Sequence, residues 1–371
     1  FGSSFGSSHF AHGSLSGHLH WSAHTHTGEH IPTCRILFAM EVATPCTYWS
    51  FFACGLLFPL HIVLGLASIP CLAVGILRGN YLALVCVCAY LPFYLYPAQF
   101  RVPGWKWDSF WDIFDVKASA VSYNGQFNVH VTEPFDPDLQ YFVGLHPHGT
   151  LIFQRMFWLT EDLRKLFKRD YRMLCMGVLF RIPLMRELTL FFGGVDAGKQ
   201  TAERIAKAGY NVVLYPGGLD EANTENGGNA VRLHTRTGFI RMAVQRGCPV
   251  IPMFCFGELE AVRAVAVLPP NVATFLKRHF RMSSTVFVGR WGTFVPARTP
   301  FNLIVGKPVA TKMCVGGPEL EEEVARVHAA FKMELRDMFE ANKKRFGYAD
   351  RDLVFTCERR KSQEGGKDKA A

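Results

Sequence analysis

Two histidines on a proline turn are the residues of this chain best suited to catalysis. They stand in the segment His146-Pro147-His148-Gly149, directly after a short apolar run at residues 140–145. Proline fixes its own φ and biases the preceding residue away from helix, so both imidazoles sit on a rigid turn. Gly149 allows close approach of the backbone and offers an N–H group to a developing oxyanion. A neutral imidazole is a natural general base for an alcohol, although a structural turn with two solvated histidines explains the same residues.

A glycine turn with a nearby carboxylate follows another apolar run, at residues 211–215. Gly217 and Gly218 permit a tight turn with exposed amides, which we expect to join Gly149 as backbone donors to an oxyanion. Glu221, shortly beyond them, supplies a carboxylate that could orient a histidine or bind a substrate hydroxyl. A generic turn accounts for the two glycines equally well.

Three arginines, Arg232, Arg236 and Arg241, stand before and within a predicted helix that begins near residue 238. Guanidinium groups bind phosphates through paired hydrogen bonds, and the N-terminus of a helix attracts anions. We therefore expect these arginines to hold the phosphates of a ligand. Arginines on a solvated helix surface are the plainer alternative.

The order of helices and strands predicts how these loops are brought together. Apolar and alternating runs indicate strands, and apolar residues at helical spacing indicate helices between them. The predicted strands are 126–131, 140–145, 211–215, 250–256 and 302–305, and the predicted helices are 152–169, 200–208, 238–246 and 318–344. This alternation predicts an α/β domain with a mostly parallel or mixed sheet flanked by helices, in which loops at strand ends carry the site.

The composition places a membrane anchor before that domain. The 371 residues are 49% hydrophobic and only 19% charged, which excludes intrinsic disorder. Residues 48–77 and 81–100 contain no charged side chain, and only Arg78-Gly79-Asn80 separates them, so we expect a two-helix transmembrane hairpin. A soluble protein with fully apolar core helices is the alternative. We divide the chain into a Ser-, Gly- and His-rich flexible tail (1–44), the hairpin (45–100), a catalytic domain (101–355) and a charged tail (356–371).

Charge and cysteine content indicate the surroundings of the domain. Three basic residues, Arg35, Arg101 and Lys106, flank the hairpin, whereas its turn contains only Arg78. Because basic residues are enriched on the cytosolic side of a membrane, this difference favours both termini in the cytosol. The first 107 residues hold four basic and two acidic residues, so most of the net charge of +9 belongs to the domain. Anionic lipid and ligand phosphates are sufficient partners, and nothing resembles a nucleic-acid module. Eleven cysteines without a CxxC pair fit a reducing compartment.

Two other reactions and one non-catalytic role compete with general-base chemistry. Residues 193–199 resemble a phosphate-binding loop, but Gln200 follows them and cannot supply the hydroxyl that binds Mg²⁺. A zinc hydrolase would use His146, His148 and Glu221. Membrane attachment alone would suit a lipid-binding or lipid-droplet-coating protein. We expect no metal ion and no cofactor.

The motifs in their order resemble those of the diacylglycerol acyltransferase 2 family, which includes monoacylglycerol and wax-alcohol acyltransferases. The resemblance covers most of residues 45–355. After the hairpin and the HPHG turn it runs through Arg181-Ile182-Pro183 with Arg186, Gly193-Gly194, Pro216-Gly217-Gly218 with Glu221, the long pattern of residues 236–258 and Val305-Gly306-Lys307-Pro308.

This resemblance implies acyl transfer from acyl-CoA, as co-substrate, to the hydroxyl of diacylglycerol, without an acyl-enzyme. It implies His148 as the catalytic base with His146 beside it, Glu221 as the companion acid, and acyl-CoA phosphates at the three arginines. Monoacylglycerol or long-chain-alcohol acylation is the alternative. It also implies a multi-pass protein of the endoplasmic reticulum membrane, with lipid droplets as a second location. The ending Lys367-Asp368-Lys369-Ala370-Ala371 resembles a retrieval signal of that membrane. Acceptor preference and oligomeric state, including a homo-oligomer, stay open.

Overall fold

The structure is a computed structural model that describes residues 64–222, 229–279, 285–293 and 295–356. All of these belong to one unit of the chain, residues 43–371. The predicted tail at residues 1–44, the first part of the predicted hairpin at residues 45–63 and the retrieval-like C-terminal end lie outside the described residues.

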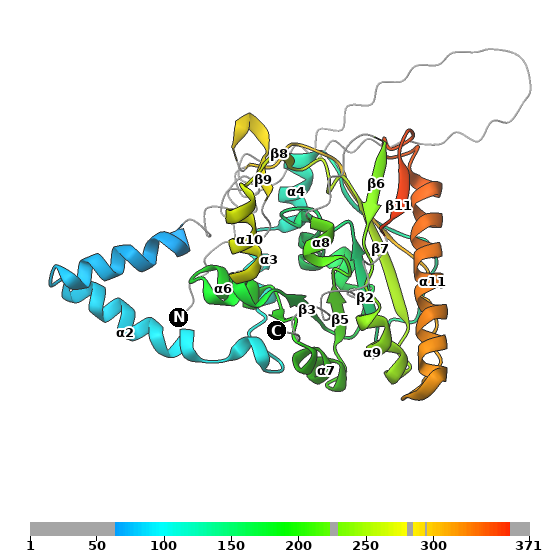
Figure 1. The fold of residues 1–371 in the computed structure, drawn as a ribbon, viewed down its shortest axis with the longest axis horizontal. Helices are drawn as coiled ribbons and strands as arrows, with labels where there is room; N and C mark the ends of the chain where they lie inside the picture. Colours follow the sequence, from blue (N-terminus) through cyan, green and yellow to red (C-terminus); the bar gives the residue numbers. More distant parts are fainter. Residues whose placement is uncertain (1–63, 223–228, 280–284, 294, 357–371) are drawn as a thin grey trace, which may run out of the picture. The chain divides into compact units, whose positions relative to one another are not determined.

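Seven described strands form one mixed sheet (Figure 1). They are β1 (Phe127–Val131), β2 (Phe142–His146), β3 (Tyr171–Cys175), β4 (Gly194–Asp196), β5 (Asn211–Leu214), β7 (Val250–Phe256) and β10 (Phe301–Val305). Their order is β1-β10-β7-β2-β5-β3-β4. The strands from β7 to β4 are parallel, whereas β10 is antiparallel to β7 and pairs with β1 in parallel. The predicted α/β fold with a mixed sheet is confirmed.

Helices and two small sheets surround this sheet. The α-helices are α3 (Asp108–Asp112), α4 (Val116–Asn124), α5 (Glu161–Arg164), α6 (Met185–Phe191), α7 (Lys199–Lys207), α8 (Gly218–Ala222), α9 (Gly238–Arg246), α10 (Pro270–His279) and α11 (Gly317–Asn342). The 3-10 helices are η1 (Ala98–Phe100), η2 (Phe153–Leu159), η3 (Gly177–Arg181) and η4 (Arg290–Gly292). The strands β6 (Ala230–Leu233) and β11 (Asp352–Phe355) pair in parallel, and β8 (Arg263–Val267) and β9 (Thr285–Val288) pair antiparallel.

The central sheet is buried on both faces because its strands are apolar at nearly every position. All seven residues of β7 are buried, and alternate ones enter two different cores. Ile251 and Met253 face the core that contains residues of α4 and η2, whereas Val250 and Phe254 face the core formed with α9 and α11. Because β7, β2, β5 and β3 are parallel, the loops after their last residues meet at one edge of the sheet.

Two apolar helices precede this domain. The helix Leu64–Leu77 is followed by the turn at residues 78–80 and by α2 (Tyr81–Leu95), whose first N–H groups are capped by the Asn80 side chain. Near the turn the helices are in contact, since a Cβ on Gly75 would lie 3.0 Å from that of Ala83. Their other ends meet one loop: a Cβ on Gly65 would collide with the carbonyl of Pro183, and the Tyr94 hydroxyl donates to the nearby Arg181 carbonyl. These helices therefore form a hairpin whose open end rests on the loop before α6.

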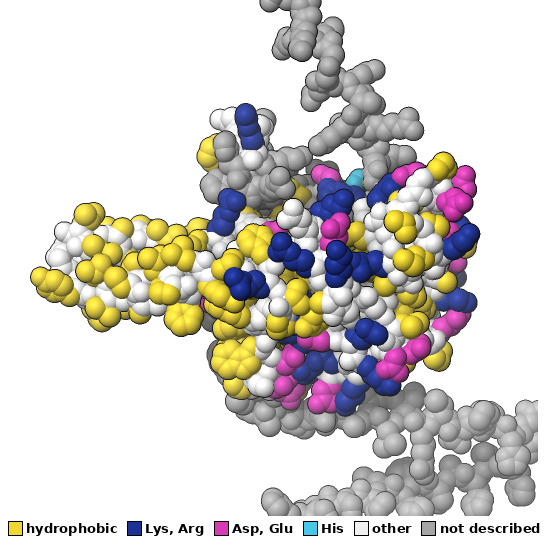
Figure 2. Space-filling model, turned by 90° about the horizontal axis from the view of Figure 1, so that it is seen from below, with side chains coloured by type: hydrophobic (Ala, Val, Ile, Leu, Met, Phe, Trp, Pro, Cys, Tyr) yellow, Lys and Arg dark blue, Asp and Glu magenta, His cyan; other side chains and the backbone are white. Residues whose placement is uncertain are grey.

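The surface of this hairpin is apolar. Figure 2 shows it covered by hydrophobic side chains, while the charged side chains gather on the α/β domain. Leu77 and Tyr81 at the tip are 87% and 82% exposed. Residues 81–100 are long and apolar enough to cross a membrane, whereas the helix 64–77 is shorter than a span within the described residues. The described part of the chain thus holds one candidate membrane span, and a two-span hairpin stays a proposal.

The predicted continuous helix over residues 152–169 is wrong. The segment forms the 3-10 helix η2 and then the single turn α5, separated at Thr160. Phe157, Trp158 and Leu159 are buried in succession, which a helix with one apolar face cannot achieve. The loop that carries the histidines is therefore followed by an irregular segment rather than by a regular helix.

Candidate active site

The strand β2 ends at His146, whose imidazole lies inside the protein. Its side chain is fully buried, and Nδ1 lies 3.1 and 3.0 Å from the two carboxylate oxygens of Glu221. Because a carboxylate only accepts, Nδ1 carries the hydrogen. His146 is thus an oriented buried ring, and the alternative of two solvated histidines is wrong.

Glu221 on α8 connects three segments of the chain. Besides the His146 ring, its carboxylate accepts the backbone N–H groups of His148, at 2.5 Å, and of His234, at 3.0 Å. Burial works to raise the pKa of Glu221, but the interactions with His146 and with these two N–H groups hold the pKa below its ordinary value. An ionised Glu221 therefore fixes the backbone of the histidine turn.

The His148 ring is oriented by the backbone rather than by an acid. Its Nδ1 lies 2.8 Å from the carbonyl oxygen of Gly149, and since a carbonyl only accepts, Nδ1 carries the hydrogen and Nε2 is the acceptor. Burial lowers the pKa of His148 below 6.5, so the ring is neutral at pH 7. We expected Glu221 to support the catalytic histidine as its companion acid. In the structure Glu221 contacts the His146 ring and the backbone N–H group of His148, and not the His148 ring.

A second buried carboxyl, which sequence reasoning did not single out, holds the other end of the same loop. Glu258 follows β7 and accepts the N–H groups of Phe153 at 2.9 Å and Gln154 at 2.7 Å. The Gln154 amide in turn donates to the Pro147 carbonyl. Burial raises the pKa of Glu258 to about 8. In the sequence, only its place at the end of the 236–258 pattern marks Glu258. Its hydrogen-bond partners lie about 100 residues earlier in the chain, so the pattern does not reveal its role.

Two of the three predicted glycines make room for these two carboxyls. A Cβ on Gly217 would collide with the Glu221 carboxylate, and one on Gly149 would lie 2.6 Å from Glu258 Oε1. Gly149 also has a φ of 61°, which favours glycine. The N–H group of Gly218 donates to the Tyr215 carbonyl, so this predicted oxyanion donor is already engaged. The turn at residues 217–218 therefore leaves the space that the Glu221 side chain occupies.

Tyr215 is a further group that the sequence did not single out. Its ring meets the His148 ring edge-on, with 5.3 Å between centroids. Its hydroxyl is buried without a hydrogen-bond partner among the described residues. The Tyr215 ring thus forms part of the surroundings of His148, and the hydrogen bonds of the described residues leave its buried hydroxyl unsatisfied.

The predicted phosphate-binding arginines lie on separate elements. Arg241 pairs with Glu321 of α11 through two contacts of 2.6 Å, and Arg236 pairs with Asp220 of α8 at 2.5 Å. Arg232 lies in β6, opposite Val354 of β11. Among the three it is Arg236 that lies beside Gly218.

Neither the phosphate-binding loop at residues 193–199 nor the zinc site is supported by the contacts of the described residues. A strand and a helix do flank residues 197–198, but Lys199 is exposed and lies 3.8 Å from Glu203 on its own helix. For a zinc site, no group of three or more His, Cys, Asp or Glu side chains that could hold a metal is found within the described ranges.

Comparison with known proteins places the chain in one family. The family model described as diacylglycerol acyltransferase matches residues 82–356. The chain is 29% identical to diacylglycerol O-acyltransferase 1 of Eremothecium gossypii over 58% of this chain and 50% of that protein. It is 27% identical to 2-acylglycerol O-acyltransferase 1 of Bos taurus, over 63% and 75%, and 26% identical to the human acyl-CoA wax alcohol acyltransferase 2, over 62% and 74%.

Among solved structures, the 1-acyl-sn-glycerophosphate acyltransferase of Thermotoga maritima matches 75% of this chain and 94% of its own, at 15% identity and a TM-score of 0.37. The match to the Eremothecium gossypii protein spans half of that protein's length. The family model, in contrast, matches most of this chain and includes both buried carboxyls and the histidine turn. The chain belongs to the diacylglycerol acyltransferase family.

Proposed function

We propose that the chain is an acyl-CoA-dependent O-acyltransferase that transfers a fatty acyl group to the free hydroxyl of diacylglycerol and so makes triacylglycerol. The observation that carries the proposal is the state of His148. Its Nδ1–H is held by the Gly149 carbonyl, and burial keeps the ring neutral. Nε2 is therefore free of its proton at neutral pH and can accept one from an alcohol.

The reaction needs one proton acceptor and one oxyanion site. His148 Nε2 takes the hydroxyl proton as the alcohol oxygen forms a bond to the thioester carbon, and backbone N–H groups near Gly149 stabilise the oxyanion. The C–S bond then breaks, and the imidazolium returns the proton to the leaving thiolate of CoA. The Tyr215 ring packs edge-on against the His148 ring, and its hydroxyl, which has no hydrogen-bond partner among the described residues, is our candidate for a hydrogen bond to the substrate.

Direct transfer without an acyl-enzyme agrees with the state of the nearby thiols. Burial raises the pKa of Cys175 to about 12 and also raises that of Cys255. Because the thiolate is the nucleophile, thiols with raised pKa values are poor acyl acceptors. Within the proposed catalytic domain, residues 101–355, the sequence also has no GxSxG segment that would supply a nucleophilic serine.

The hairpin supplies the location that such a reaction needs. An anchor in the bilayer keeps the domain where a water-insoluble acceptor dissolves, while acyl-CoA arrives from the cytosol. We propose a two-span hairpin with both termini cytosolic in the endoplasmic reticulum membrane, with lipid droplets as a second location. Arg236, beside the glycine turn, is our choice for a contact with the CoA phosphates.

A panel of acceptors tests this proposal. Membranes containing the full chain are incubated with labelled oleoyl-CoA and, separately, with 1,2-diacylglycerol, 2-monoacylglycerol or a long-chain alcohol, and the labelled products are separated. We expect triacylglycerol as the main product. A preference for either other acceptor would move the chain to the activities named for its bovine or human relatives, and lipid binding without transfer would indicate a non-catalytic protein.

A further inference from the structure

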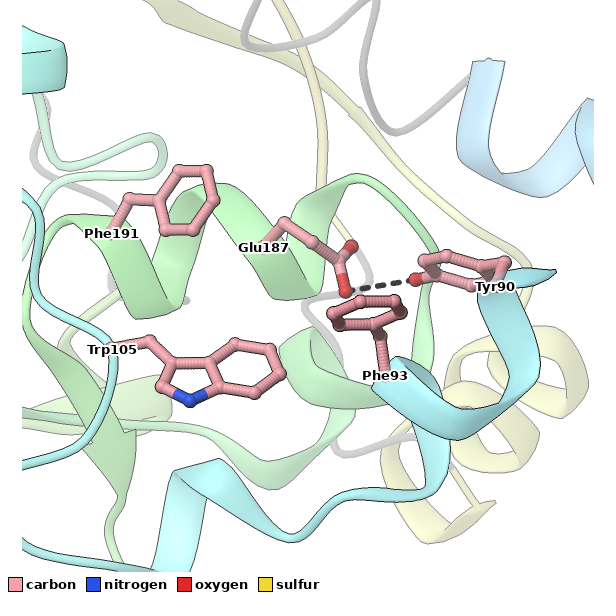
Figure 3. Close-up of a pocket in the computed structure, with 5 residues that line it drawn as sticks. All are labelled: Tyr90, Phe93, Trp105, Glu187 and Phe191. Carbon is pink, nitrogen blue, oxygen red and sulfur yellow. Dashed lines mark hydrogen bonds between the residues drawn. The ribbon is translucent and has the colours of Figure 1, made fainter.

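A pocket lies where the hairpin meets the α/β domain. Tyr90 and Phe93 of α2 form one side, Glu187 and Phe191 of α6 form another, and Trp105 closes the base (Figure 3). Its volume is about 340 Å³, which is within the range of ligand pockets. Phe93 is 61% exposed on the apolar surface of the hairpin, so the pocket opens toward the side that we place in the bilayer.

The only carboxylate of this wall is already paired. One oxygen of Glu187 accepts from the Tyr90 hydroxyl at 2.8 Å and from the Arg186 guanidinium at 2.8 Å. The other oxygen accepts the N–H group of Leu184 at 2.9 Å. The rings of Phe93, Trp105 and Phe191 complete a wall that offers no free charge, so the pocket suits an uncharged, apolar ligand.

Contacts among Arg186, Tyr96 and Trp105 fix the positions of the segments that line the pocket. Arg186 is fully buried, donates to the carbonyl of Tyr96 at 2.6 Å and lies 5.1 Å from the centre of the Trp105 ring. The Tyr96 ring stacks on the same indole, with 5.3 Å between centroids and 2° between planes. The end of α2 and the start of α6 are thus fastened around the same tryptophan.

Side chains that pack against two shared apolar clusters connect the surroundings of this pocket with those of His148. Trp105 and Cys175 pack against the same small apolar cluster, made of Ala98, Phe180 and Leu190. Cys175, the last residue of β3, and Tyr215, the first after β5, lie at the sheet edge that carries the histidine turn, and both pack against the core under it. The Arg155 guanidinium interacts with both of them, and the Tyr215 ring meets that of His148.

We infer that the hairpin pocket binds one acyl chain of the neutral lipid acceptor and holds it on the way from the bilayer to His148. The inference rests on the proposed acyl transfer for the identity of the lipid. Diacylglycerol is uncharged and matches a wall without free charge, whereas the phosphates of acyl-CoA would meet no cation among the residues that line the pocket.

Photocrosslinking tests this inference without requiring turnover. The full chain is reconstituted in phosphatidylcholine vesicles containing diacylglycerol with a diazirine in one acyl chain, irradiated, and mapped by mass spectrometry. We expect labels at residues 90–105 and 187–191, and competition by unlabelled diacylglycerol. Phe93→Gln is compared with Leu95→Gln, which changes a side chain of similar exposure, 67%, outside the pocket.

Phe93→Gln is expected to lower labelling in the pocket and to raise the KM for diacylglycerol about tenfold, because it removes a large apolar contact, with the KM for acyl-CoA unchanged. Leu95→Gln is expected to change neither. Labels spread evenly along the hairpin, competition by acyl-CoA alone, or equal behaviour of the two variants would overturn the inference. Pocket labelling by a chain that transfers no acyl group would instead refute the proposed reaction and support the lipid site.

Discussion

Replacing Gly149 by alanine tests whether the Glu258 carboxyl positions the histidine turn. At φ 61° an L-residue costs about 1–2 kcal/mol. The new Cβ would lie 2.6 Å from Oε1 and 2.8 Å from Cγ of Glu258, so the carboxyl must withdraw from the N–H groups of Phe153 and Gln154. Each of these hydrogen bonds contributes about 1 kcal/mol. We therefore expect the free energy of unfolding to fall by about 3–4 kcal/mol.

The same variant is expected to lose activity, since displacement of a catalytic group by about 1 Å costs about 100-fold in rate. The assay is acyl transfer from labelled oleoyl-CoA to diacylglycerol, together with thermal unfolding in detergent. Gly125→Ala is the matched control, because Gly125 has a φ of 81° and nothing within 4 Å of the added Cβ. It carries the backbone strain alone and should keep full activity. Equal activity and equal stability of the two variants would refute the positioning role of Glu258.

Three further predictions concern the ionisable groups of the site. Between pH 4.5 and about 8 the folded protein keeps a proton on Glu258 that the unfolded chain releases, so stability falls as pH rises through this window, and thermal scans of Glu258→Gln should lack this slope. Because burial lowers the pKa of His148, the acid limb of kcat/KM should have its midpoint below pH 6.5, and a midpoint above 7 would contradict a neutral base. Glu221→Gln leaves at least one of three buried donors unpaired, so denaturant unfolding should show a loss of about 1–3 kcal/mol, and unchanged stability would argue against this network.

Elements with a clear local period could be predicted from the sequence. The helix at residues 238–246 and the strand at 250–256 are found with the predicted bounds, and the long helix predicted at 318–344 is Gly317–Asn342. Each has a uniform apolar run or an apolar face that depends on neighbours close in sequence. The strand Tyr171–Cys175 was missed, because its five residues include Arg172, which is buried in the fold through its hydrogen bond to the Pro103 carbonyl and its ion pair with Asp170.

The candidate site was predictable in its residue types but not in its contacts. His146, His148 and Glu221 follow apolar strands, so their meeting at one sheet edge follows from a parallel sheet. Which histidine the carboxylate contacts depends on the turn of the chain at Pro147, and the sequence does not contain that geometry. The role of Glu258 depends on N–H groups 104 and 105 residues away, which a local pattern cannot reveal.

The rate of acyl transfer by His148→Ala tests the central claim most directly. The variant is compared with wild type and with His130→Ala, which removes a histidine of β1 that contacts Asn302 outside the site. Loss of a general base should lower kcat about 10²–10⁴-fold with the KM for acyl-CoA retained, and His130→Ala should behave as wild type. Equal turnover by His148→Ala and wild type would contradict the account.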